Sequence, residues 1–205
     1  MRTAAQVVSV VLHPMTMSTF GLLCYYSFFP TVSQFNDKGL FLQIFLRVFV
    51  FTIMLPISSV LVMMRIGKVS SVFIEERKER SWPLLVVAAI YLATPVYILN
   101  SPRVPIFINL FILGAAGALI VALLINLKWK ISLHMIGIGG LCGALMNLYF
   151  CLQEGNPLWL SLCFVLAGVL GTARLLLNAH NYLQILAGFA LGFAAEFSLG
   201  YFAVH

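Results

Sequence analysis

The sequence predicts an all-α protein, a polytopic transmembrane bundle whose helices cross the membrane six or seven times. The 205 residues are 62% hydrophobic and only 9% charged, which is more apolar than a water-soluble core requires. The apolar residues also form continuous runs of about 20, the length of a helix that crosses a bilayer. A membrane barrel would instead show short segments of alternating polarity.

Polar and proline-containing breaks set the limits of the spans. The segment 100–105 contains Pro102, Arg103 and Pro105, and it divides an apolar stretch that is too long for one crossing. The first apolar run lacks a small-residue cleavage site, so we expect it to be retained and 1–205 to form a single membrane domain. The expected spans are 5–29, 40–64, 84–99, 106–125, 135–152, 158–170 and 183–203.

The basic residues gather in loops beside the spans. A net charge of +6 from 12 Lys and Arg is too small to suggest nucleic acid, and cations in such positions meet lipid phosphates. The four cysteines lie within apolar runs without a CxxC pair, which favours structural thiols. With seven crossings, the loops 65–83, 128–134 and 174–180 share one face of the membrane, so their cations and histidines can converge.

Three polar residues lie at fixed spacing between the last two spans. Arg174 is suited to bind phosphate oxygens with its two-pronged guanidinium, and His180 can attack phosphorus or move a proton. Gln184, one helical turn after His180, can fix the tautomer of its ring. His134 enters the fifth span as a candidate general acid, beside Ser132, Lys128 and Lys130.

This pattern resembles the type 2 phosphatidic acid phosphatase superfamily. The segment from Arg174 through His180 to Gln184 is similar to its third signature, Ser-Arg, five residues, His, three residues, Asp. Ile131-Ser132-Leu133-His134 is similar to its second signature, Pro-Ser-Gly-His. The resemblance implies a nucleophilic His180 that forms a phosphohistidine, His134 as the acid, Arg174 as the phosphate ligand, and neither metal nor cofactor. The implied substrate is a phosphorylated membrane lipid, such as phosphatidate, a polyprenyl diphosphate, phosphatidylglycerol phosphate or lipid A.

The chain departs from the family at several positions. Gln184 replaces the family's Asp, and Ala173 replaces the Ser before the arginine, where Thr172 could supply a hydroxyl instead. Ile131 and Leu133 replace the Pro and Gly of the second signature. The first signature, Lys, six residues, Arg-Pro, is absent. The remaining phosphate ligands could come from the segment around Arg77, Lys78 and Arg80, or from Lys128 and Lys130.

Three functions therefore stay open. The first is a lipid phosphatase, and the second is a non-catalytic relative that binds a phosphorylated lipid. The third is a small transporter that uses Glu196 and His13 inside the membrane. The loop cations favour a cytoplasmic site by the positive-inside rule, whereas the resemblance implies the periplasmic face of a bacterial inner membrane, the side we favour.

Overall fold

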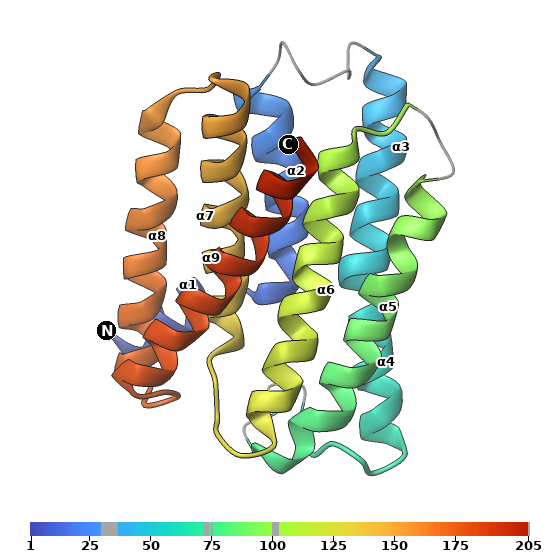
Figure 1. The fold of residues 1–205 in the computed structure, drawn as a ribbon. Coiled ribbons are helices and arrows are strands. Elements are labelled where there is room, and N and C mark those ends of the chain that lie inside the picture. The colour runs from blue at the N-terminus through green and yellow to red at the C-terminus, as the bar shows by residue number, and fades with distance from the viewer. Residues whose placement is uncertain (30–36, 72–73, 75, 100–102, 205) are drawn as a thin grey trace.

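The computed structural model describes residues 1–29, 37–71, 74, 76–99 and 103–204, without the side chains of 98, 99 and 200–204, and its described part contains no strand (Figure 1). The helices form an upright bundle in which α9 crosses in front of α7. Their bounds are α1 Arg2–Val11, α2 Met17–Phe28, α3 Lys38–Phe49, α4 Leu55–Arg65, α5 Ser81–Leu99, α6 Ile106–Asn126, α7 Leu133–Leu152, α8 Pro157–Leu176 and α9 Tyr182–Val204. Three short helical turns, η1 Pro14–Thr16, η2 Val50–Met54 and η3 Lys78–Arg80, complete them.

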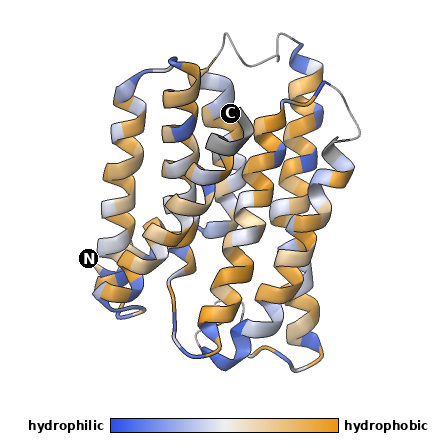
Figure 2. Ribbon diagram, in the orientation of Figure 1, coloured by the Kyte–Doolittle hydropathy of each residue, from blue (hydrophilic) through white to orange (hydrophobic). Residues whose placement is uncertain are grey.

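Six helical segments in the described chain are long and apolar enough to cross a membrane. They are Arg2–Phe28, Lys38–Arg65, Ile106–Asn126, Leu133–Leu152, Pro157–Leu176 and Tyr182–Leu199. The 19-residue helix α5 runs beside α6 along the same bundle. Apolar residues cover most of the helix lengths, and polar residues gather at the two ends (Figure 2). The chain is therefore an all-α, multi-pass integral membrane protein.

The segment expected as one span at 5–29 is divided into two helices. α1 ends before Pro14, which has no N–H to continue the helix, and η1 links it to α2. His13 caps this turn, because its Nδ1 accepts a hydrogen bond from the N–H of Met15 at 3.3 Å. α1 packs against α8, whereas α2 rises through the bundle beside α7. The break places His13 inside the bundle and close to the start of α7.

The long segment of α3 and α4 contains a π-helical turn at η2. Pro56, just after this turn, cannot bond to the carbonyl of Thr52, four residues earlier. The hydroxyl of Tyr91 on α5 donates to that carbonyl at 3.3 Å. The Tyr91 side chain thus supplies a donor to an acceptor whose α-helical donor is missing, and it joins α5 to the turn.

Glycines bring α7 and α9 into close contact. A Cβ atom on Gly192 would lie 2.0 Å from the carbonyl oxygen of Ile136, and one on Gly139 would lie 2.3 Å from that of Phe189. Gly143 on α7 likewise meets the backbone of Phe193, and Gly188 on α9 meets that of Ser132, so each helix carries two small residues four positions apart at the crossing. This crossing sets the start of α7 against the start of α9, where the histidine-bearing segments lie.

Candidate functional site

His180 lies in a tight connection between α8 and α9 that its own sequence specifies. Asn178 adopts a left-handed conformation with a φ of 52°, which ends α8. The N–H of Ala179 bonds to the carbonyl of Arg174 at 3.1 Å, and the N–H of Asn178 bonds to that of Leu175 at 2.9 Å. These two bonds form a Schellman motif. The chain therefore reverses immediately after Arg174 and returns His180 to the same end of the bundle.

A capping box begins α9 and also orients His180. Asn181 accepts a hydrogen bond from the N–H of Gln184 at 3.0 Å, and Oε1 of Gln184 accepts from the N–H of Asn181 at 3.3 Å. The same Oε1 lies 3.0 Å from Nδ1 of His180. A backbone N–H can only donate, so the amide atom that faces it is oxygen, and Nδ1 of His180 carries the proton. Nε2 of the neutral ring keeps its lone pair.

Two more histidines lie together at the start of α7. Nε2 of His134 lies 3.0 Å from the carbonyl oxygen of Ser9, an atom that only accepts, so the neutral ring carries its proton on Nε2. The ring of His13 meets the ring of His134 edge-to-face, with 5.3 Å between centroids. The N-terminal segment therefore forms one wall of this site. Nδ1 of His134 is the ring nitrogen that remains for proton transfer.

The charges around His180 are positive. The pKa of His180 is lowered to about 4, first by burial and then by the cations of Arg80, Arg174 and Lys130, while the hydrogen bond that Nδ1 donates to Gln184 acts in the opposite direction. No carboxylate is among the groups that act on this ring. Nε of Arg174 is shielded from solvent and has no hydrogen-bond partner among the residues that the structure describes. A half-buried guanidinium of this kind is suited to an anionic ligand.

Hydrogen bonds fasten the three loops together at this end of the bundle. The guanidinium of Arg77 donates to the carbonyls of Asn126 and Leu127, and Nδ2 of Asn126 donates to the carbonyl of Arg77 at 3.1 Å. The N–H of Ser132 bonds to the carbonyl of Gln184 at 3.4 Å. The segments before α5, before α7 and before α9 therefore lie side by side (Figure 1).

The side chains of the remaining candidates are exposed or bonded to other groups. Thr172 is exposed, and its hydroxyl donates to the carbonyl of Gly168 at 2.9 Å. It lies two residues before Arg174 on α8 and therefore on a different side of that helix. Ser132 is fully buried, and its hydroxyl caps α7 by accepting from the N–H of Met135. Lys78 and Lys128 are exposed and do not act on His180. Of the basic residues around the first-signature position, Arg80 is the one that influences the ring.

Two further groups lie at the site. The sequence predicts a kink at His13-Pro14 and allows a buried His13 to line the cavity, and the structure places His13 in the η1 turn beside His134. The carbonyl of Ser9 carries no sequence signal, because any residue at that position offers one. Across the described residues, no group of three His, Cys, Asp or Glu side chains could hold a metal ion.

Comparisons with protein-family models, with curated proteins and with solved structures found no match to this chain. The class that fold and site define is a multi-pass helical membrane protein with a cluster of histidines and cations at one end of its bundle. The likeness to the type 2 phosphatidic acid phosphatase superfamily rests on the residues of the two signatures.

Proposed function

We propose that this chain is a divergent lipid phosphatase of the type 2 phosphatidic acid phosphatase class, acting on a phosphorylated membrane lipid. One observation carries the proposal: His180 presents Nε2 with its lone pair, held by Gln184 and surrounded by the cations of Arg80, Lys130 and Arg174. Phosphoryl groups need such a combination of a fixed nucleophile and positive charge. By the resemblance, the reaction needs no metal.

The proposed reaction has two steps. In the first, Nε2 of His180 forms a bond to phosphorus, and the bond between phosphorus and the lipid oxygen breaks. His134 takes up a second proton, on Nδ1, from the monoanionic phosphate as it binds, and gives that proton to the leaving oxygen while its Nε2–H remains bonded to the carbonyl of Ser9. In the second, water attacks phosphorus, returns a proton to His134 and displaces the imidazole. Inorganic phosphate and a lipid alcohol are the products. We place the site on the periplasmic face of a bacterial inner membrane.

A phosphate-release assay on the purified full chain tests this function. Phosphatidate, a polyprenyl diphosphate and lipid A are the substrates, and we expect release from at least one of them. His180→Ala should abolish it, and Arg174→Ala should reduce it by about 100-fold or more, because one stabilising donor is worth that much. Ser161→Ala, at the far end of α8, is the matched control. No release from any substrate, or an undiminished rate in His180→Ala, would contradict the proposal.

A non-catalytic lipid-phosphate receptor is the second candidate, and the neutral amide of Gln184 favours it. An amide orients the ring but supplies no negative charge to stabilise it once it becomes cationic. This candidate predicts binding of lipid phosphate that weakens in Arg174→Ala, with no turnover in the wild-type chain. Release of phosphate by Gln184→Asp alone would mark the wild-type chain as the receptor.

A further inference from the structure

A second polar site lies inside the bundle, away from the histidines. Glu196 on α9 is only 4% exposed, although α9 is a membrane-crossing helix. It lies roughly 18 Å further along α9 than Gln184, at 1.5 Å per residue. Its carboxyl group is therefore not part of the proposed phosphate site.

Glycines on two neighbouring helices make room for this carboxyl group. A Cβ atom on Gly114 of α6 would lie 2.5 Å from Oε2 of Glu196, and one on Gly140 of α7 would lie 3.2 Å from its Cγ. Within the described chain, no residue donates a hydrogen bond to the carboxyl or pairs with it. A bare carboxylate is costly in an apolar interior, so it must hold a proton or another cation.

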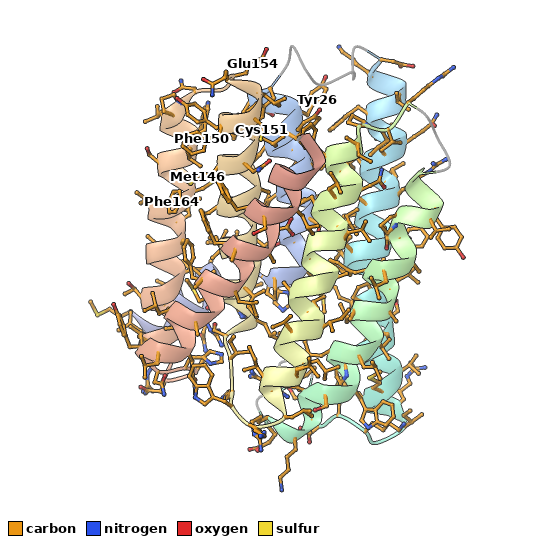
Figure 3. The ribbon with its side chains drawn as sticks, in the orientation of Figure 1. Tyr26, Met146, Phe150, Cys151, Glu154 and Phe164 are labelled. Atoms are coloured by element: carbon orange, nitrogen blue, oxygen red, sulfur yellow. The ribbon has the colours of Figure 1, made fainter. Side chains whose placement is uncertain are left out.

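A cavity of about 40 Å³ adjoins Glu196, enough space for water or a small ion. Its lining is apolar apart from Glu196 and three other polar side chains, Ser18, Tyr25 and Asn147. Nδ2 of Asn147 donates to the carbonyl of Phe197 at 3.0 Å, so its oxygen is the amide atom that remains. That oxygen accepts only a weak bond from the thiol of Cys151, which lies at the upper end of α7 in Figure 3.

The polar atoms of the cavity are therefore mainly oxygens. Carboxylate and amide oxygens bind hard cations, whereas an anion would need N–H donors or positive charge. No Lys, Arg or His is among the residues that line the cavity, and Tyr25 is the other lining residue that titrates. We propose that Glu196, Asn147 and this cavity form an intramembrane binding site for a small monovalent cation, a proton or a sodium ion.

Carbodiimide labelling of the purified full chain tests this site. Dicyclohexylcarbodiimide reacts with a protonated carboxyl in an apolar setting, and its stable acylurea adduct is located by peptide mass spectrometry. We expect labelling of Glu196 in sodium-free buffer and its loss in Glu196→Gln. If the site takes a proton alone, labelling depends on pH and is unchanged when sodium chloride replaces choline chloride. If it takes sodium, sodium chloride suppresses labelling at constant pH and raises the melting temperature.

A matched pair of glycine variants separates the site from a general effect on folding. Gly114→Ala puts a methyl group where the carboxyl oxygens lie, so it should reduce labelling several-fold. Gly117→Ala, on the same helix, meets nothing within 4 Å and should leave labelling unchanged. The proposal would be overturned if Glu196 of the folded wild-type chain stays unlabelled between pH 5 and 8 in sodium-free buffer. The melting temperature shows that the chain is folded under these conditions. Equal labelling of the two glycine variants would also overturn the proposal.

Discussion

At the scale of single residues, Gln184 determines the state of His180. Its Oε1 accepts from Nδ1 of the ring, and burial together with nearby cations keeps the pKa of His180 at about 4. The ordinary value is 6.5. Between pH 6.5 and about 4, His180 binds a proton in the unfolded chain but not in the folded protein. The free energy of unfolding therefore falls as the pH falls through this range. At neutral pH the ring stays uncharged and Nε2 stays available.

Gln184→Glu should raise the pKa of His180. Glutamate preserves the length of the side chain and the capping box but adds a negative charge beside the ring, which favours the imidazolium. The measurement is a pH titration followed by NMR of ¹⁵N-labelled histidine, with His180→Asn to assign the signal. If the variant hydrolyses phosphate, the acidic limb of its rate profile should move to higher pH in parallel, because the attacking ring must be neutral. An unchanged titration would contradict the assigned contact.

The residues of this site differ in how far the sequence specified them. Arg174, His180 and Gln184 were predictable as a group because a Schellman motif and a capping box are local patterns. Arg80, Lys78 and Lys128 could not be told apart from sequence, since the side chain that approaches the ring depends on how three loops pack. Thr172 could supply a hydroxyl by its sequence position, but in the structure it is exposed and its hydroxyl donates to the carbonyl of Gly168.

At the scale of elements, prolines and glycines shape the bundle. All-helical, membrane-crossing architecture followed from the apolar runs and is confirmed. The division of the first expected span into two helices at Pro14 was not predicted beyond a kink, and it affects the site directly because it brings Ser9 and His13 to His134. A run of apolar residues gives the length of a helix but not the direction in which it leaves a proline break.

Tyr91→Phe should destabilise the protein by about 1 kcal/mol, because the buried carbonyl of Thr52 would lose its donor. Tyr97→Phe is the matched control on the same helix, where the side chain is 60% exposed and the effect should stay within about 0.5 kcal/mol. Reversible unfolding of the purified protein in mixed detergent measures both changes. Equal stability of the two variants would show that Tyr91 contributes no useful bond to the π-helical turn.

At the scale of the whole molecule, three loops from distant parts of the sequence meet at one end. The break between α5 and α6 makes this possible, because it puts the segment before α5 on the same side as the segments before α7 and α9. The hydrogen bonds of Arg77 to the carbonyls after α6 hold two of these loops together. The grouping depends on α5 running the length of the bundle beside α6, which the sequence pattern left open between six and seven crossings.

Cysteines placed at Lys78, Lys128 and Tyr182, all exposed, should react with an impermeant thiol reagent from the same side of the membrane. A cysteine at Lys38, at the start of α3, should react only from the other side. The four native cysteines are first replaced to remove background. Labelling in intact and in permeabilised cells gives the side directly. Reaction of Lys78→Cys and Tyr182→Cys from opposite sides would contradict the arrangement of the helices.

Oε1 of Gln184 couples the tautomer of His180 to the order of the first turn of α9. Because the same atom holds the first turn of α9 and the ring of His180, fraying of that turn would let the imidazole rotate and move its one proton from Nδ1 to Nε2. The reactivity of Nε2 of His180 therefore depends on the order of the first turn of α9. A ligand that immobilises the ring would also stabilise this turn. A lipid environment that disorders the start of α9 would lower the reactivity of Nε2 without contacting the ring.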